Sequence, residues 1–420
     1  MKASISKSEI AGKVTAPSSK SYTIRGLICG ALASGKSTIA FPLASDDTIA
    51  ATNVLKKIGI SIRQQQNNWL VDGGNFHATK EDLFCGDSAA TLRFMAAICS
   101  IIPGTSHLTA GPSLSRRPVK TLLDALRQLG NDCSSNNDLP PVTVNGGKLN
   151  GGTTSLPGNI SSQFVSALLQ VAPFAENGMV IKLTSPLESR PYVIMTLDTM
   201  QWFGITVAFN DNLDEFEILP QRYKPTKFRV EGDWSSASYL LALGALSGEV
   251  EVNNLDTESL QGDRMIIRFL QEMGAAVTVG RNSIIVRQSK LKAIKADLND
   301  CIDLLPTVAV LAAVAEGTSE FTGIERARIK ESDRVTSLRA GLEKMGIPVT
   351  EESNLLAITG KKPKGTQITS HNDHRIAMAF SLLGSVAGET VIEQAECVTK
   401  TYPEFWEVFK KLGGRVKLNE

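Results

Sequence analysis

The chain has 420 residues, 42% of them hydrophobic, which is enough for about two to three domains with sizeable cores. Its 44 lysine and arginine residues nearly balance its 43 aspartate and glutamate residues. This balance excludes a global field that would recruit nucleic acid or an anionic membrane, so any affinity for anions must be local. The N-terminus lacks the apolar core of a signal sequence, and no later segment approaches a membrane span. We therefore expect a cytoplasmic protein, and we expect it to act as a monomer.

In chain order, six clusters of small polar and charged residues each open an apolar helical stretch. The clusters lie near Lys20, Asp87, Ser162, Asp233, Asp303 and Asp373. A second series of amphipathic helical runs ends in glycine, and a short run typical of a strand follows each glycine, for example at 205–208 and 276–279. These glycines are Gly59, Gly130, Gly204, Gly274, Gly346 and Gly413. Both series repeat about every 70 residues, which predicts one αβ unit used six times.

A polar stretch with prolines at 220–225 separates the third unit from the fourth. It predicts two halves of three units each. The N-terminal end of a helix carries a partial positive charge and attracts anions. If each half turns its helix starts toward the other, a cleft gathers basic side chains and positive helix ends around one set of anionic ligands.

Residues 30–37 fit the nucleotide-binding pattern G-x-x-x-x-G-K-S. The context contradicts that interpretation, because the preceding residues have a helical period and Pro42 stands where the required helix should run. We interpret Gly35 as a helix stop instead. His77 and His107 lie in turn-like surroundings without metal-ligand spacing, and we expect them to be solvated.

The six cysteines are scattered, without paired spacing or neighbouring histidines. They predict reduced packing residues rather than a metal site, and we expect neither metal nor cofactor. The cysteines are Cys29, Cys85, Cys99, Cys133, Cys301 and Cys397.

Seven motifs in register carry far more information than any one of them alone. They are residues 17–25, 116–118, 161–164, 188–192, 330–334, 372–375 and 400–403. In order and spacing they resemble the 5-enolpyruvylshikimate-3-phosphate synthase family over essentially the whole chain. The resemblance implies an α/β fold of two domains, each built from three βαβαββ units with helices buried between the sheets. It also implies an active site in the cleft between the domains, with the first domain at 19–230 and the second at 1–18 plus 231–420.

The same resemblance implies an enzyme that transfers the enolpyruvyl (carboxyvinyl) group from phosphoenolpyruvate to the 5-hydroxyl of shikimate 3-phosphate. Phosphate leaves by addition and elimination, without metal or cofactor, in the shikimate pathway of aromatic amino acid biosynthesis. Arginine forks suit the planar or multidentate oxyanions of these two substrates, lysine supplies point charge, and hydroxyls add orientation.

Carried over motif by motif, the resemblance assigns residues to each substrate. Shikimate 3-phosphate would be held by Lys20, Ser21, Arg25, Ser161, Ser162, Gln163, Ser189, Tyr192, Asp303 and Lys330. Phosphoenolpyruvate would be surrounded by Lys20, Ala89, Arg117, Gln163, Arg334, Arg375 and Lys400. The candidate catalytic residues are Asp303 as proton acceptor beside the 5-hydroxyl, Glu331 as acid for the enol ether carbon, and Lys20, which would share either transfer.

Two other functions remain to be weighed. The related UDP-N-acetylglucosamine enolpyruvyl transferases share the six-unit architecture, but they typically carry a cysteine five residues before the matching arginine, where this chain has Pro112. A noncatalytic protein that binds phosphorylated metabolites would have no need of Asp303 and Glu331.

The chain departs from the family in the glycine-rich loop at 86–93, where Asp87 replaces the usual asparagine and Ala89 the usual glycine. It also has Ser18 for glycine and Arg326 for an asparagine. A methyl group at Ala89 adds volume where a glycine allows close approach to phosphoenolpyruvate. In this family glyphosate occupies that place and is longer, so we expect intrinsic glyphosate tolerance, unless the loop has shifted to absorb the methyl.

Overall fold

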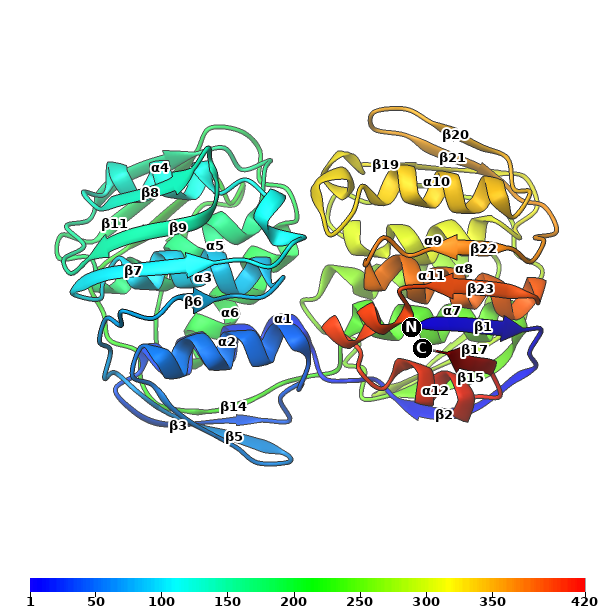
Figure 1. Ribbon diagram of the computed structural model, residues 1–420, viewed down its shortest axis with the longest axis horizontal. Helices are drawn as coiled ribbons and strands as arrows, with labels where there is room; N and C mark the ends of the chain where they lie inside the picture. The colour runs from blue at the N-terminus through cyan, green and yellow to red at the C-terminus, as the bar shows by residue number, and fades with distance from the viewer. Residues whose placement is uncertain (420) are drawn as a thin grey trace. The chain divides into compact units, whose positions relative to one another are not determined.

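The computed structural model describes residues 1–419. They form two compact units, one continuous and one divided. The continuous unit is Ser18–Val230, and the divided unit joins Met1–Pro17 to the chain from Glu231 onward (Figure 1). Ser18 thus lies in the continuous unit, whereas the sequence assigned it to the other one. Within the described residues, no helix is long and apolar enough to cross a membrane.

The continuous unit contains six helices and three four-stranded sheets among its described residues. The helices are α1 (Lys20–Leu32), α2 (Asp46–Lys57), α3 (Ala89–Cys99), α4 (Lys120–Gln128), α5 (Ser162–Val171) and α6 (Arg190–Trp202). The strands are β3 (Gly35–Ala40), β4 (Ser61–Gln64), β5 (Asn68–Gly73), β6 (Leu83–Phe84), β7 (Gly104–Thr109), β8 (Asp132–Asn136), β9 (Leu139–Gly146), β10 (Gly152–Leu156), β11 (Met179–Leu183), β12 (Ala208–Phe209), β13 (Glu215–Ile218) and β14 (Lys227–Arg229). Short 3₁₀ turns are η1 (Leu114–Arg116) and η2 (Ala172–Phe174).

The described part of the divided unit likewise contains six helices and three four-stranded sheets. Its helices are α7 (Trp234–Ser247), α8 (Ile266–Glu272), α9 (Leu305–Ala312), α10 (Arg334–Lys344), α11 (His374–Ala387) and α12 (Phe405–Lys411). Its strands are β1 (Lys2–Ser6), β2 (Ile10–Thr15), β15 (Gly248–Asn253), β16 (Ala276–Val279), β17 (Ser283–Arg287), β18 (Lys295–Asp297), β19 (Thr318–Thr322), β20 (Val349–Glu351), β21 (Leu356–Thr359), β22 (Gln367–Thr369), β23 (Thr390–Glu393) and β24 (Arg415–Asn419). The 3₁₀ turns are η3 (Gly262–Met265), η4 (Ile302–Leu304), η5 (Glu325–Ile329) and η6 (Ala395–Lys400).

All six sheets share one topology, which confirms the predicted repeat. In each sheet one edge strand pairs parallel with its neighbour, and the other pairs are antiparallel. Three positions are filled by strands from elsewhere in the chain: β14 joins the sheet of β3, β2 joins the sheet of β15, and β1 lies between β23 and β24. The divided unit is therefore incomplete without the first residues of the chain.

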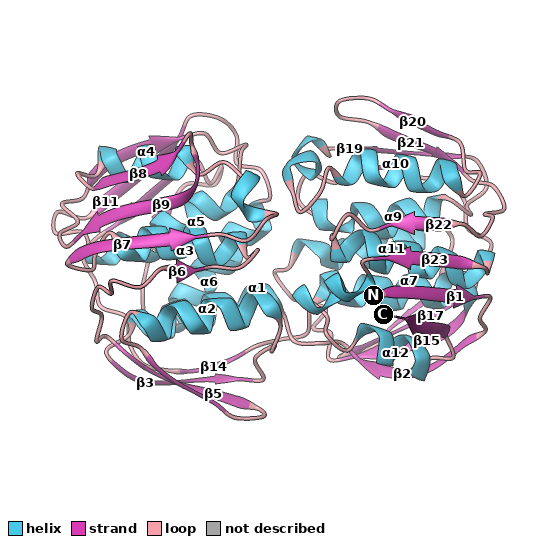
Figure 2. Ribbon diagram, viewed as in Figure 1, coloured by secondary structure: helices cyan, strands magenta, loops and turns pink. Residues whose placement is uncertain are grey.

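The helices that follow the six polar clusters form the centres of the two units (Figure 2). Helix α9 is buried along its whole length, and α7 is buried from Trp234 to Leu246. Helices α7, α9 and α11 pack against one another, and α3 packs against α1 and α5 in the continuous unit. A helix that is apolar on all sides is stable only inside a protein, which explains why these segments have little amphipathic pattern.

The helices of the second series are amphipathic and lie over the sheets. Helix α4, for example, buries Leu122, Leu123, Ala125 and Leu126. The predicted glycine stops of this series are confirmed, because all six glycines have a positive φ, between 81° and 101°. That left-handed conformation is open to glycine at little steric cost.

Two local predictions were wrong. Gly35 does not end α1, whose C-cap is Ala33, but begins β3 with φ of 120°. Residues 30–37 therefore run from helix to strand, the reverse of the order that a nucleotide-binding loop requires. The strand expected at 205–208 is only the two residues Ala208–Phe209.

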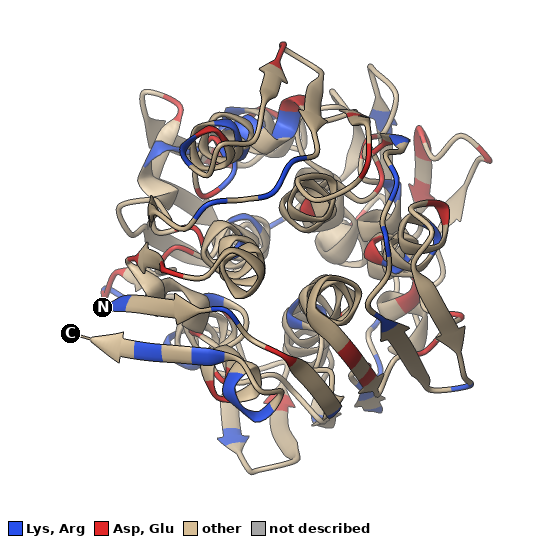
Figure 3. Cartoon of the chain, turned by 90° about the vertical axis from the view of Figure 1, so that its right-hand side faces the viewer, with Lys and Arg blue, Asp and Glu red and all other residues tan. Residues whose placement is uncertain are grey.

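Charge is distributed as the composition indicates. In the view of Figure 3, basic and acidic residues are interspersed over the strands and helices. The six cysteines are all free thiols, and five of them are buried. Burial raises the pKa of the Cys99 thiol to about 12, so it stays protonated at neutral pH and acts as a packing residue.

The place of β1 in the divided unit generates the first prediction. Ile5 is 1% exposed and packs beneath α11, so Ile5→Ala should lower the free energy of unfolding by about 2–5 kcal/mol. Ser4 points to the other face of the strand, and Ser4→Ala is the matched control, with little effect. Urea titration followed by circular dichroism measures both variants. Equal losses would mean that the strand does not use its Ile5 face as core.

Candidate active site

Three helix starts in the continuous unit are capped by serine side chains. Ser19, Ser88 and Ser161 precede α1, α3 and α5, and their hydroxyl oxygens accept N–H bonds from the first turn of each helix. Such capping fixes the first turn, where the remaining N–H groups and the helix dipole favour an anion. Lys20, Ala89 and Ser162, all predicted site residues, are the first residues of these helices.

Lys20 is held by an acid that the sequence analysis missed. Its Nζ lies 2.9 Å from Oδ2 of Asp47, with 19% and 6% of the two side chains exposed. Asp47 belongs to the first turn of α2, and its backbone carbonyl accepts a bond from the Thr91 hydroxyl of α3. The pair fixes the direction of the Lys20 ammonium. Nothing in the local sequence marks Asp47, because it is one of several acids near helix starts.

Arg25 turns its guanidinium into the unit. Nε donates to the Thr196 hydroxyl at 2.8 Å, Nη2 to the Tyr192 carbonyl at 2.9 Å and Nη1 to the Ser21 carbonyl at 3.1 Å. Burial lowers the pKa of Arg25 to about 10, which still leaves it charged at neutral pH. Arg25 therefore joins α1 to α6 and brings three predicted residues, Ser21, Arg25 and Tyr192, to one place. Ser189, which caps α6, is 2% exposed and has φ of 53°.

Arg93, the last residue of the glycine-rich loop at 86–93, has contacts that the sequence did not predict. From α3, its Nη1 donates to the Ser161 hydroxyl at 3.0 Å and to Oε1 of Gln163 at 2.8 Å. Its guanidinium also lies over the Phe164 ring, 4.6 Å from the centroid. These contacts bring the start of α5 to α3, so Gln163 and Ala89 belong to neighbouring helix starts.

The departure at Asp87 has a structural explanation. Its Oδ1 accepts backbone N–H bonds from Ser113 and Leu114, both at 2.9 Å. These residues open η1, which ends at its C-cap Arg117, a predicted site residue that is 7% exposed. An aspartate and an asparagine offer the same acceptor oxygen here, so the replacement keeps the loop attached.

In the divided unit, one buried arginine contacts three carboxylates. Arg334 is 1% exposed. Its Nε donates to Asp373 at 2.8 Å, Nη1 to Asp303 at 2.8 Å and Nη2 to Glu331 at 2.5 Å. Asp373 is also the N-cap of α11, where it accepts from the Arg375 backbone at 3.0 Å. Asp373 lies within the motif at 372–375, but its sequence context does not predict this contact.

Asp303 is surrounded by three basic side chains. Besides Arg334, it is 3.2 Å from Nη2 of Arg375 and 3.5 Å from Nζ of Lys330. Burial alone would raise the pKa of Asp303, but Arg375, Lys330 and Arg334 hold it well below its usual range. Burial lowers the pKa of Lys330 to about 8, although Asp303 opposes the shift. Asp303 is therefore a carboxylate at neutral pH, and Lys330 is close to its titration point.

The predicted site residues thus fall into two groups. One group, in the continuous unit, is Lys20, Ser21, Arg25, Ala89, Arg117, Ser161, Ser162, Gln163, Ser189 and Tyr192. The other, in the divided unit, is Asp303, Lys330, Glu331, Arg334, Arg375 and Lys400. Asp303, Lys330, Glu331, Arg334 and Arg375 form one network of contacts. Lys400 lies in η6, which packs against α11.

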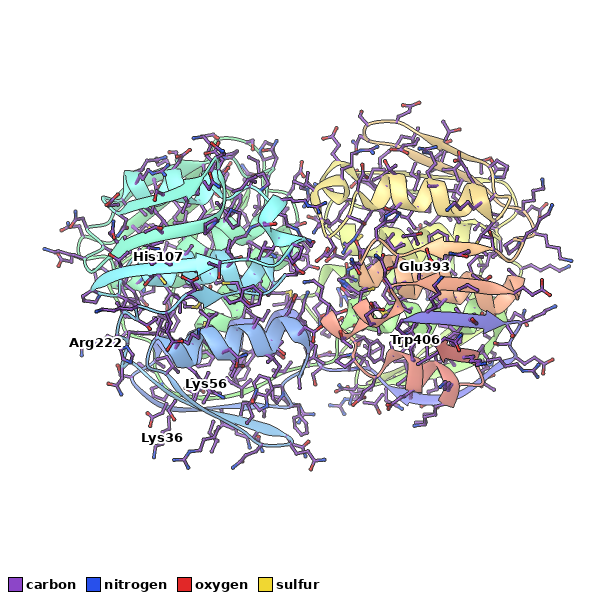
Figure 4. All side chains as sticks on the ribbon, viewed as in Figure 1. Lys36, Lys56, His107, Arg222, Glu393 and Trp406 are labelled. Atoms are coloured by element: carbon purple, nitrogen blue, oxygen red, sulfur yellow. The ribbon has the colours of Figure 1, made fainter. Side chains whose placement is uncertain are left out.

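The histidines that were expected to be solvated lie outside both groups. His107 is exposed on strand β7, where its Nδ1 is 3.1 Å from the Thr143 hydroxyl (Figure 4). His77 is also exposed. Because both side chains are exposed, the prediction that they are solvated is confirmed.

Comparison with known proteins gives a consistent result over the whole chain. A family model described as EPSP synthase (3-phosphoshikimate 1-carboxyvinyltransferase) matches residues 5–409. A 3-phosphoshikimate 1-carboxyvinyltransferase from Dehalococcoides mccartyi is 50% identical over 418 residues, 99% of each chain. The enzyme of that name from Methanosarcina acetivorans is 42% identical over 428 residues, again 99% of each. An EPSP synthase structure from Acinetobacter baumannii matches with a TM-score of 0.83 at 27% identity, covering 99% of this chain and 100% of its own.

The buried arginine generates the second prediction. Arg334→Ala would leave three carboxylates facing one another without their shared cation, so it should lower the free energy of unfolding by about 3–5 kcal/mol. Arg268→Ala is the control, because Arg268 pairs with Glu272 at 2.7 Å on the surface of the same unit and should contribute at most about 1 kcal/mol. Urea denaturation compares the two. Similar small losses would show that the carboxylates do not depend on Arg334.

Proposed function

The chain belongs to the EPSP synthase family. From this premise we propose which of its residues bind each substrate and which transfer protons. That reaction transfers the enolpyruvyl group from phosphoenolpyruvate to the 5-hydroxyl of shikimate 3-phosphate and releases phosphate, in the shikimate pathway. The observation that carries the assignment is 50% identity to a 3-phosphoshikimate 1-carboxyvinyltransferase over 99% of both chains. On this basis we propose the roles of the individual residues.

The continuous unit supplies most of the binding site for shikimate 3-phosphate. Its groups are cations and hydroxyls at helix starts, which suit a phosphate, a carboxylate and ring hydroxyls. We assign to this role Lys20, Ser21, Arg25, Ser161, Ser162, Gln163, Ser189 and Tyr192. The contacts of Arg25 and Arg93 support it, because they join α1 to α6 and α3 to the start of α5.

Phosphoenolpyruvate carries both a phosphate and a carboxylate, and it needs cations on more than one side. Lys20, Ala89, Arg117 and Gln163 would contact it from the continuous unit, and Arg334, Arg375 and Lys400 from the divided unit. Lys330 and Asp303 of the divided unit would complete the site for shikimate 3-phosphate. We therefore propose that both groups of residues act on the same pair of substrates.

Asp303 is the proposed acceptor of the 5-hydroxyl proton. A carboxylate with a pKa well below its usual range is a weak base, and the cause is the three cations around Asp303. When the anionic substrates bind to Arg375, Arg334 and Lys330, their negative charge compensates those cations. The pKa of Asp303 then rises, so the base becomes stronger when the substrates are in place.

Glu331 is the proposed acid. Its bond to Arg334 favours the carboxylate form, and the carboxylate of phosphoenolpyruvate would compete for that arginine. Released in this way, Glu331 can carry a proton to the methylene carbon, C3, while the 5-oxygen bonds to C2 and Asp303 takes the hydroxyl proton. In the elimination, a proton leaves the new methyl group and the C2–O bond to phosphate breaks, which restores the double bond. Fixed cations stabilise the charge that develops at each step.

A phosphate-release assay tests this division of roles and is the third prediction. The wild-type protein should release phosphate only when both substrates are present. Asp303→Asn and Glu331→Gln should each lower kcat by about 10²–10⁴-fold, because each removes a proton-transfer group. Glu316→Gln, which alters an exposed acid of the same unit, should leave kcat unchanged. Phosphate release with one substrate alone, or full activity in both site variants, would contradict the proposal.

The fourth prediction concerns Ala89. It is the first residue of α3 and 7% exposed, so its methyl group lies at a tightly packed helix start. We propose that this methyl makes the enzyme glyphosate-tolerant. Ala89→Gly should then strengthen inhibition by about 1–3 kcal/mol, or about tenfold for each 1.4 kcal/mol. Inhibition constants of the two proteins decide the matter, with the KM for phosphoenolpyruvate as control. Equal inhibition constants for the two proteins would show that the loop has shifted to accommodate the methyl group.

We also propose that the protein acts as a monomer in the cytoplasm. The supporting observation is that its six cysteines are free thiols, as is usual in a reducing compartment. Light scattering during size-exclusion chromatography measures the mass directly, and a dimer mass would contradict the first part of the proposal.

A further inference from the structure

The segment that carries Lys330 and Glu331 lies between the 3₁₀ turn η5 and helix α10. Turn η5 ends at Ile329, Lys330 is its C-cap, and Asp333 is the N-cap of α10. Lys330, Glu331 and Arg334 all contact other groups of the proposed site through their side chains. Their positions therefore depend on what holds the two ends of this segment.

Both ends are attached to one carboxylate outside the site. Glu351, the last residue of β20, accepts from Nη1 of Arg328 at 2.5 Å, before the segment. Its Oε1 also lies 3.0 Å from the hydroxyl of Thr336, in the first turn of α10 after the segment. Nε of Arg339, one turn further along the same helix, donates to Glu351 at 2.6 Å. We call Arg328, Thr336, Arg339 and Glu351 the clamp.

The clamp is partly buried, and its two arginines share one carboxylate. The Glu351 side chain is 16% exposed and that of Arg328 is 25% exposed. Burial would raise the pKa of Glu351, but the bonds from Arg328, Arg339 and Thr336 lower it below its usual range. Glu351 is therefore ionised at neutral pH, and its bonds to the two arginines are charge-assisted, the stronger kind of hydrogen bond.

Arg328 also fixes the β20–β21 hairpin to η5. Its Nη2 donates to the Glu352 carbonyl at 2.6 Å and its Nε to the Ser353 carbonyl at 3.3 Å. At the other end of η5, the Ile324 backbone donates to Oδ1 of Asn354 at 2.8 Å. The hairpin turn thus holds η5 along its length, and Arg328 connects that anchor to Glu351.

The N-cap of α10 belongs to the same arrangement. Asp333 accepts from the Thr336 backbone at 3.1 Å, and the Thr336 hydroxyl lies 3.0 Å from Oδ2 of Asp333. The Thr336 hydroxyl is thus within hydrogen-bond distance of both Asp333 and Glu351. A change at Glu351 would alter the start of α10, and Arg334 is the first residue of that helix.

We propose that Glu351 is a positioning residue for proton transfer, which it serves by clamping both ends of the segment that carries Lys330 and Glu331. The proposal rests on the roles assigned to those two residues above. In this proposal Glu351 itself does not contact the substrates. Its effect is geometric, since a displacement of about 1 Å in a reacting group can lower a rate by about 10²-fold.

A purely structural role is the alternative to be excluded. The clamp borders a hollow of about 660 Å³, lined also by Glu343 and Val349, so water can take the place of lost contacts. Loss of Glu351 then affects stability less than loss of a core residue. The test must therefore measure whether Glu351 acts through Glu331, rather than only whether activity falls.

The experiment, our fifth prediction, is a double-mutant cycle on kcat with Glu351→Gln and Glu331→Gln. Alone, Glu351→Gln should lower kcat by about 10-fold to 10²-fold. In the Glu331→Gln background, the same change should lower kcat by less than about threefold, because the group that it positions is already absent. Glu352→Gln is the matched control: it removes the same charge from the exposed neighbouring residue and should leave kcat unchanged.

Each outcome has one meaning. Wild-type kcat in Glu351→Gln, beside an inactive Glu331→Gln, overturns this inference and leaves the role of Glu331 intact. A loss that multiplies in full in the double variant also overturns it, because Glu351 would then act independently of Glu331. Full activity in Glu331→Gln contradicts the proposed function and the inference together. Should Glu351→Gln fail to fold, Arg328→Lys, which keeps the charge but loses the fork to two backbone carbonyls, goes through the same cycle.

Discussion

The divided unit is organised around the need to neutralise one buried guanidinium. Arg334 is 1% exposed, and a charge so far from water is stable only when it is paired and hydrogen-bonded. Three carboxylates meet this need, from η4, from the segment before α10 and from the N-cap of α11. The repeated architecture makes this possible, because successive repeats bring their helix starts together. In the proposed mechanism the same carboxylates serve proton transfer, because anionic substrates would compete with them for Arg334.

The continuous unit uses its cations differently. Arg25 and Arg93 donate mainly to hydroxyls, carbonyls and an amide oxygen, and Lys20 has a single acid partner. Neutral acceptors offset a positive charge less than carboxylates do, which suits the binding of anions. One architecture therefore carries two electrostatic arrangements, one in which the cations have mainly neutral partners and one in which cations and carboxylates are paired. The difference arises from a few side chains at equivalent helix starts rather than from the fold.

The repeat, the glycine stops and the family could be predicted from the sequence, because periodicity and motif spacing are local properties. Contacts between distant segments could not. Lys20 and Asp47 are in different helices, and nothing in either helix specifies that their side chains meet. The clamp on Glu351 was missed for the same reason. Gly35 shows a different error: it was interpreted as a helix stop, but it begins β3, because a glycine with positive φ can start a strand as well as end a helix.

The position of β1 between β23 and β24 has a consequence for how the chain can be rewired. Lys2 lies opposite Asn419 in antiparallel pairing, so these two residues are one strand spacing apart. A short loop of the kind that joins hairpin strands would bridge them. If the chain were then opened between Pro17 and Ser18, the resulting circular permutant would encode the continuous unit first and the divided unit second, each as an unbroken segment. Either segment would then be a natural candidate for separate production and recombination in the test tube.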